Sequence, residues 1–241
     1  METLLTAIVL KSSDVNESDK IVTLFSPESG KSSAILKGVK KEKAKLKFAA
    51  EPFCFGKFEL TGAGAVKTVT GCEQIEPFFE ITKDLTKFYC GCAALEFAYH
   101  TAQENEENPG LFIVVLKTLQ QLCLNDVAPE IVLIKFVLDA FGALGQRLCF
   151  DKCAACGEQA VWFYFDFDSG GAICPACAKQ NFYTPDAAAM SILKIVSDLN
   201  FDKLRFYKCN GALIKNALIF LNGVLANHVH KIKSLKELIE L

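Results

Sequence analysis

Cys153-Ala-Ala-Cys156 and Cys174-Pro-Ala-Cys177 are two Cys-x-x-Cys pairs separated by seventeen residues. This is the spacing of a four-thiolate zinc site. Four thiolates around Zn²⁺ form a closed tetrahedral shell, so the pattern predicts one structural zinc ion rather than a catalytic metal. Two alternatives stay open from the residues alone: four unrelated buried thiols, or a redox-active dithiol. Cys149 is a further thiol nearby, but its three-residue separation from Cys153 makes a poorer metal-binding pair.

The residues between the two cysteine pairs are suited to a hairpin. Val161-Trp-Phe-Tyr-Phe-Asp166 has strand propensity, and Asp168-Ser-Gly-Gly171 is a turn sequence. Ala172-Ile173 then begins a return strand. We therefore expect a zinc-binding hairpin module over residues 149–178.

Upstream of the module, residues 1–77 contain five short segments with strand character. Pro27-Glu-Ser-Gly30 is a turn between the second and third segments, and Gly56 predicts a bulge or bend in the fourth. The segments are Thr3–Leu10, Lys20–Ser26, Lys31–Lys37, Phe53–Leu60 and Val66–Ile75. Five short antiparallel strands fit a small barrel, and the OB-fold is the commonest such case. A five-stranded barrel of another topology fits the same pattern.

From Pro77 onward the hydrophobic period changes from two residues to 3.6, which predicts helices over residues 78–241. Thr184-Pro185 predicts a helix start with Thr184 as the N-cap. Ser234-Leu-Lys-Glu237 predicts a capping box that opens a short last helix. The other expected helices lie around 85–99, 111–122, 131–141, 187–199 and 211–229. The chain is thus predicted to be a multidomain α+β protein, with an N-terminal OB-fold β-barrel followed by an all-helical domain that carries the four-cysteine zinc-binding hairpin.

The bulk composition is that of a soluble protein in a reducing compartment. The 241 residues carry a net charge of −2, so a nucleic-acid partner would need a local basic patch. No segment approaches the roughly 18 apolar residues of a membrane span. The apolar stretch Leu4–Leu10 is short and lacks the preceding basic residue of a signal peptide. Thiols outside the two pairs are expected to act mostly as small apolar residues: Cys54, Cys72, Cys90, Cys92, Cys123 and Cys209.

A run of lysines extends across the third expected strand and the next loop, where Glu42 is the only acid. The lysines are Lys31, Lys37, Lys40, Lys41, Lys43, Lys45 and Lys47. A basic loop beside a barrel face, with aromatic residues nearby, is how single-strand binders follow a phosphate backbone. The alternative is a solvated loop, and the neighbouring phenylalanines Phe48, Phe53, Phe55 and Phe58 are individually expected in the core.

Lys203-Leu-Arg-Phe-Tyr-Lys208 offers a second basic surface on the helical part, through Lys203, Arg205 and Lys208. No G-x-S-x-G, H-E-x-x-H or P-loop motif is present, and the chain has only three histidines. We therefore expect a protein that is not an enzyme. A metal-dependent hydrolase is a further hypothesis, but a closed shell of four thiolates argues against it because it leaves no open position on the metal.

Six further stretches stand out by their order and spacing: Glu17–Phe25 running to Gly30-Lys31, Leu36–Val39, Phe48–Phe53, Phe141–Gly145 before Cys153 and Cys156, Phe167–Gly171 before Cys174, and Lys233–Lys236. Together they resemble the RecO family of bacterial DNA repair and recombination mediators. The resemblance implies an N-terminal OB-fold and a helical C-terminal domain with a zinc site in many members. The zinc ligands correspond to the four paired cysteines, and the DNA-contacting basic loop corresponds to Lys37, Lys40, Lys41, Lys43, Lys45 and Lys47.

The function that the resemblance implies is a recombination mediator of the RecF-pathway type. Such a protein binds single- and double-stranded DNA, promotes strand annealing, and with RecR helps load RecA on coated single strands. It also contacts the tail of single-strand binding protein, and it is cytoplasmic and nucleoid-associated, with no membrane partner. This chain departs from the family pattern because its first 146 residues contain no arginine, which predicts weaker or more salt-sensitive DNA binding. The alternative function is a zinc-stabilised protein-interaction adaptor without direct DNA binding.

Overall fold

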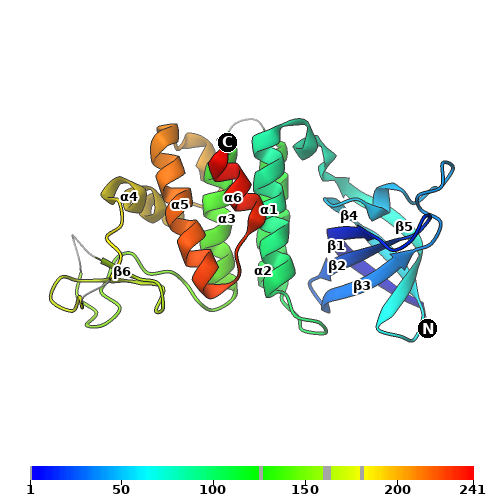
Figure 1. Cartoon of the computed structure of the whole chain (residues 1–241), viewed down its shortest axis with the longest axis horizontal. Coiled ribbons are helices and arrows are strands. Elements are labelled where there is room, and N and C mark those ends of the chain that lie inside the picture. Colours follow the sequence, from blue (N-terminus) through cyan, green and yellow to red (C-terminus); the bar gives the residue numbers. More distant parts are fainter. Residues whose placement is uncertain (1, 125–126, 160–163, 180–181) are drawn as a thin grey trace.

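The computed structural model of the chain describes residues 2–124, 127–159, 164–179 and 182–241. Figure 1 shows an elongated molecule with a β-barrel at one end, a stack of helices in the middle and a small hairpin module at the other end. The N-terminal residues form the barrel, and the helices follow it in the chain. No helix in the described part of the chain is long and apolar enough to cross a membrane.

The barrel is closed, with the strand order β1-β2-β3-β5-β4. Its strands are β1 (Glu2–Asp14), β2 (Lys20–Ser26), β3 (Gly30–Leu36), β4 (Cys54–Thr61) and β5 (Val66–Pro77). β3 pairs with β5 in parallel, and the other neighbouring strands are antiparallel. This order and direction are those of the OB-fold, so the predicted topology is confirmed.

A bulge lies at the predicted position, but its extra residue, Ile75, belongs to β5, opposite Gly56, and not to β4. The register between β4 and β5 shifts between Phe55 and Gly56. A Cβ atom at position 56 would lie 2.7 Å from the carbonyl oxygen of Glu73, so only glycine fits this close strand approach. Phe53, Phe55 and Phe58 are buried, as expected for core residues.

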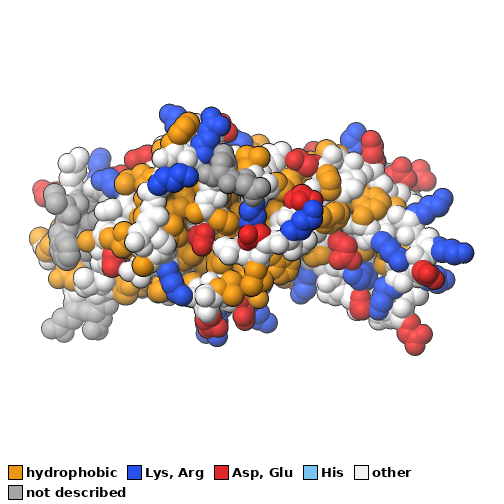
Figure 2. Space-filling model, turned by 90° about the horizontal axis from the view of Figure 1, so that it is seen from above, with side chains coloured by type: hydrophobic (Ala, Val, Ile, Leu, Met, Phe, Trp, Pro, Cys, Tyr) orange, Lys and Arg blue, Asp and Glu red, His pale blue; other side chains and the backbone are white. Residues whose placement is uncertain are grey.

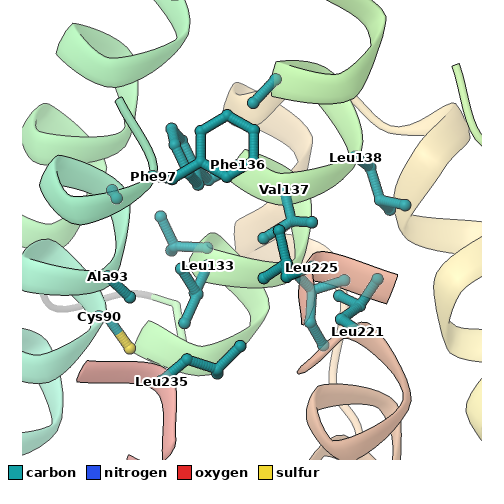
Figure 3. Packing of buried hydrophobic residues seen from close by; sticks show 14 of the residues in the cluster. Cys90, Ala93, Phe97, Leu133, Phe136, Val137, Leu138, Leu221, Leu225 and Leu235 are labelled. Atoms are coloured by element: carbon teal, nitrogen blue, oxygen red, sulfur yellow. The ribbon is translucent and has the colours of Figure 1, made fainter. Parts of the chain in front are cut away.

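The helices stack side by side next to the barrel (Figure 1). They are α1 (Leu85–Thr101), α2 (Pro109–Cys123), α3 (Pro129–Ala143), α4 (Ala187–Asp198), α5 (Gly211–His228) and α6 (Lys233–Glu240). α3 is the central helix, because every residue from 131 to 138 is buried. Even Lys135 is buried there, and its Nζ lies 2.6 Å from Asp139. Figure 3 shows Phe97, Phe136 and Leu225 converging from different helices around α3.

One hydrophobic cluster joins residues of the barrel to the helices, and a second cluster fills the barrel interior. Phe25 of β2 packs edge-on against Phe112 of α2, with ring centroids 5.6 Å apart. Phe53 packs in the same way against Phe88 of α1 at 6.1 Å. The barrel is therefore fixed to the helices by apolar burial.

Both predicted helix caps were wrong. At α4 the N-cap is Asp186, whose side chain accepts the N–H groups of Ala188 and Ala189, and Thr184 lies before it. At α6 Ser234 lies inside the helix, and the N-cap Ile232 makes no side-chain hydrogen bond. A carboxylate from α1, Glu96, accepts these first N–H groups, so the local capping box is not used.

Candidate metal centre and nucleic-acid interface

The four paired cysteines bring their sulfur atoms together. The Sγ atoms of Cys153, Cys156, Cys174 and Cys177 all lie within 4.8 Å of one another. The Sγ atoms of Cys156 and Cys174 are 3.8 Å apart. Tetrahedral zinc with Zn–S bonds of about 2.3 Å requires sulfur separations of about 3.8 Å. The donor set and its spacing therefore fit a four-thiolate metal ion.

Tight backbone turns build each cysteine pair. In the first pair the N–H of Gly157 donates to the carbonyl oxygen of Cys153 at 2.8 Å. Gly157 has φ of 78°, a left-handed conformation that favours glycine. In the second pair, the N–H groups of Cys177 and Ala178 both donate to the carbonyl oxygen of Cys174 at 3.0 Å. Each turn folds the chain back, so both sulfurs of a pair face the same point.

A short hairpin joins the two pairs. It consists of β6 (Tyr164–Asp166) and β7 (Gly171–Ile173), which are antiparallel. The first half of the predicted strand 161–166 lies outside the described residues. Ala154 N–H donates to the carbonyl oxygen of Ala172 at 2.7 Å, which ties the first cysteine pair to the hairpin.

Cys149 does not take part in the sulfur cluster. Its thiol is exposed and lies 3.7 Å from the carbonyl oxygen of Lys152. The slipped arrangement that would use Cys149 as a ligand is therefore not adopted.

The protein environment already favours a thiolate in the cluster. Backbone N–H groups of Cys174 and Cys156 point at the sulfur of Cys153 and lower the pKa of its thiol to about 6. The pKa of Cys177 is raised to about 12, chiefly because its thiol hydrogen-bonds the sulfur of Cys174. A bound divalent cation would deprotonate the remaining thiols by its own charge.

Aromatic packing attaches the module to α5. The ring of Phe165 in β6 lies edge-on to Phe220 of α5, with centroids 4.8 Å apart. Phe167 contacts the same ring at 5.9 Å. A Cβ atom at Gly223 would lie 3.2 Å from the Phe167 ring, so the glycine allows this approach. The cluster is thus placed to fix a hairpin against the helical part.

Six of the seven predicted DNA-binding lysines lie together. They follow β3 on the loop that leads to the 3₁₀ turn at Phe48–Ala50, and all six are exposed: Lys37, Lys40, Lys41, Lys43, Lys45 and Lys47. At the barrel end of the molecule, Figure 2 shows basic side chains that project beside acidic ones. These six lysines therefore lie on a single loop of the barrel.

Lys31 lies apart from the other six, near the start of β3. Its ammonium donates to the carbonyl oxygen of Tyr99 in α1 at 2.8 Å. It also lies 4.9 Å from the centroid of the Tyr99 ring. Lys31 therefore contacts the helical part of the molecule. It does not lie on the loop that carries the other six predicted DNA-binding lysines.

Backbone contacts hold the start of the lysine loop in place. Gly38 has φ of 66°, and its N–H donates to Asp19 Oδ1 at 2.6 Å. This hydrogen bond is the main cause that lowers the pKa of Asp19. The N–H of Lys40 donates to the carbonyl oxygen of Ser18 at 3.0 Å. The loop is thus positioned by the turn that precedes β2.

Lys20 was not predicted from the sequence as part of this surface. It lies beside the loop and forms an ion pair with Glu51 at 3.0 Å. Both residues line a cavity of about 320 Å³, together with Val39, Lys40, Lys47 and Ala50. Lys20 pairs with Leu36 in the β2–β3 hairpin. The sequence held a signal for this position. If the two strands are paired residue by residue from the predicted turn 27–30, Lys20 falls opposite Leu36 and therefore beside Lys37.

The second predicted basic surface lies on the 3₁₀ turn η3 (Phe201–Phe206) and just after it. Phe201 and Leu204 are buried and anchor the turn, whereas Lys203, Arg205 and Lys208 are exposed. Phe206 between them was not predicted as part of the surface. Its side chain is 73% exposed, and the guanidinium carbon of Arg205 lies 4.9 Å from its ring centroid.

Comparison with known proteins agrees with this architecture. Residues 1–78 match the family described as recombination protein O, N terminal, and residues 82–236 match recombination protein O, C terminal. A DNA repair protein RecO of Dehalococcoides mccartyi (strain CBDB1) is 29% identical over 211 residues, covering 86% of this chain and 83% of its own. The Bacillus cereus (strain AH187) protein of the same name is 31% identical over 176 residues, covering 73% and 71%. The chain belongs to the RecO family of DNA repair proteins.

Proposed function

We propose that the protein binds DNA through the lysine loop 37–47 and acts as a non-enzymatic recombination mediator. The observation that carries this proposal is the position of six exposed lysines on one loop of an OB-fold barrel. Lysine ammoniums contact phosphates as point charges, without selecting a base sequence. The loop therefore suits binding to the backbone of single strands, and of duplexes with the same chemistry.

Membership in the family supports the further steps. On this proposal the protein anneals complementary single strands and, with RecR, helps load RecA on strands coated by single-strand binding protein, whose tail it contacts. These activities place it in the bacterial cytoplasm with the nucleoid DNA. None of them requires a catalytic group.

We also propose that the four thiolates hold one Zn²⁺. Cysteine thiolates in a tetrahedral arrangement are the ligands of structural zinc. The ion would fix the hairpin against α5 and would leave no coordination position for a substrate. Its role is therefore structural, consistent with a protein whose chemistry is binding.

We propose that the second basic surface, at Lys203, Arg205 and Lys208, contacts a second DNA strand. An exposed aromatic ring beside cations offers a base-stacking surface together with charges for phosphates. Phe206 with Lys203 and Arg205 has this composition. A protein that anneals two strands needs to hold both, and two separate basic surfaces would allow this.

Annealing of complementary oligonucleotides tests the function. The protein should accelerate annealing of both bare strands and strands coated with single-strand binding protein. A gel shift at about 50 mM salt distinguishes the adaptor alternative, because phosphate contacts are strong in this range. No shift, no annealing and a retained protein partner would favour an adaptor that does not bind DNA directly.

A further inference from the structure

We propose that the cavity between Lys20, Lys40 and Lys47 is a phosphate subsite whose lysines are neutralised by two carboxylates, Glu51 and Asp14, until DNA displaces them. The inference rests on the proposed DNA binding by the loop and deepens it. It adds one residue that the lysine run does not contain, Lys20, and it assigns the two acids an inhibitory role.

The two ion pairs hold lysines at the cavity. Lys20 Nζ lies 3.0 Å from Glu51 Oε1, and Lys40 Nζ lies 2.6 Å from Asp14 Oδ2. Both lysines line the cavity of about 320 Å³, and Lys47 is a third lysine in its lining. Three lysines around one space, with a single acid in its lining, form a site for an anion.

Within each pair the lysine is the more enclosed partner. The Lys20 side chain is 23% exposed and that of Glu51 is 52% exposed. The corresponding values are 31% for Lys40 and 57% for Asp14. The carboxylates can therefore turn out into water while the ammoniums stay at the cavity.

The backbone also fixes the lysines more firmly than a solvated loop would. Lys20 is in the ladder of β2, opposite Leu36 of β3. The N–H of Lys40 is bound to the Ser18 carbonyl oxygen at 3.0 Å. Because these backbone positions are set before DNA arrives, little ordering is required to bind a phosphate there.

A phosphate should replace the carboxylates at low cost. Partly exposed ion pairs contribute little to stability because water competes with both partners. A phosphate can accept hydrogen bonds from several ammoniums at once, whereas each carboxylate engages one. Val39 and Ala50 add apolar walls to the cavity, which strengthen the attraction for an anion.

The acids persist as competitors at neutral pH. The hydrogen bond from Lys40 lowers the pKa of Asp14, so this carboxyl remains ionised near pH 7. DNA must therefore exchange with an ionised partner at Lys40, and removal of the acid should strengthen binding.

Three variants that each remove one negative charge test the proposal: Glu51→Gln, Asp14→Asn and the matched control Glu42→Gln. Glu42 lies in the same loop, is exposed, and has no salt bridge among the described residues. Binding of a fluorescent single-stranded oligonucleotide is measured over a salt series. Glu51→Gln and Asp14→Asn should each raise affinity several-fold at about 50 mM salt and steepen the log–log salt slope by about 0.7, the value for one added phosphate contact.

Glu42→Gln should give a clearly smaller gain. Equal gains in all three variants would mean that only the general loop charge matters, and would overturn the subsite. Adding Lys20→Gln to the Glu51→Gln variant should abolish its gain, whereas a gain that persists would also overturn it. Thermal unfolding of each variant verifies that the barrel stays folded.

Two further experiments complete the test. The first asks whether the bound phosphate is internal or at a strand end, and the second distinguishes failure of the subsite from failure of the proposed DNA binding by the loop. Equal binding of oligonucleotides with a 5′-hydroxyl or a 5′-phosphate assigns the subsite to an internal backbone phosphate, and a preference for the latter assigns it to a strand end. If reversing Lys41 and Lys43 weakens binding while the acid variants behave like Glu42→Gln, only the subsite fails. If reversal of Lys41 and Lys43 has no effect either, the proposed function of the loop fails.

Discussion

The carboxylate of Glu96 in α1 holds Ser234 at the start of α6 through two hydrogen bonds. Glu96 Oε2 accepts both the backbone N–H and the hydroxyl of Ser234 at 3.0 Å. Its other oxygen accepts the N–H of Lys233 at 2.9 Å. A residue 138 positions away in the chain thus supplies the cap of the last helix.

Glu96→Ala should therefore destabilise the protein. The change leaves the first N–H groups of α6 without their carboxylate acceptor and removes a negative charge from a helix N-terminus. We expect a loss of about 1–2 kcal/mol in the free energy of unfolding. Urea unfolding measures it, with Glu107→Ala, an exposed acid before α2, as the control. Equal stability of the two variants would contradict this capping role.

Metal removal should loosen the hairpin module selectively. Structural zinc contributes about 10–16 kcal/mol to the folding of small finger peptides. Here the helical core around α3 does not contain the cluster, so Cys156→Ser or a strong chelator should release the module without unfolding the barrel. The single tryptophan, Trp162, lies between the cysteine pairs in the sequence, so its fluorescence should respond.

Native mass spectrometry provides the direct readout of the metal. We expect one zinc ion per freshly purified chain and none in the Cys156→Ser variant. Protein that is fully folded and free of metal would refute the zinc site.

Protein stability should fall as acidification takes the pH from about 7 to below the folded-state pKa of His100. The ring of His100 lies against that of His230, with centroids 4.2 Å apart. Burial lowers the pKa of His100 from its usual 6.5, and the charges of His230, Lys31 and Lys11 lower it further, against an opposing effect of Glu96. The unfolded state binds a proton more readily, so this contribution is present above about pH 6.5 and is lost as pH falls through the folded pKa.

Replacing His100 by Gln tests this assignment. Urea unfolding at both ends of this pH range should show a smaller pH-dependent loss in His100→Gln than in the unsubstituted chain. The same loss in both proteins would assign the pH dependence to other groups.

Phe206→Ala should weaken single-strand binding and slow annealing. Stacking of one base on an aromatic side chain is worth about 1–3 kcal/mol. The control is Ile219→Ala, which truncates another exposed apolar residue, on α5. If both variants promote DNA annealing as fast as the unsubstituted protein does, the turn η3 does not bind a DNA strand. Loss of a protein partner with intact annealing would instead make Phe206 a docking residue.

Local sequence signals predicted most of the fold. Alternation and turn residues identified all five barrel strands, and the glycine at position 56 identified where the β4–β5 register shifts, although the extra residue lies on β5. The Cys-x-x-Cys spacing identified the four sulfurs that meet. These features depend on neighbours in the chain, where pattern reasoning works best.

Several of the features that were missed depend on long-range partners. Ser234 could not be recognised as a residue inside the helix because its acceptor, Glu96, comes from another helix. The contact of Lys31 with the carbonyl oxygen of Tyr99, 68 residues away, has no local signal in the sequence. Lys20 joins the basic loop only through strand pairing, and its neutralising partner Glu51 lies 31 residues away.

The central claim is that the lysine loop binds DNA phosphates. The most direct measurement is the salt dependence of single-strand affinity for the unsubstituted chain, Lys41→Glu/Lys43→Glu and the charge-matched control Lys117→Glu/Lys215→Glu on α2 and α5. The loop variant should bind more weakly, and its log–log slope should be shallower by about 1.4, which corresponds to two phosphate contacts. The control should bind like the unsubstituted chain. An identical affinity and slope in the loop variant and the unsubstituted chain would contradict the account.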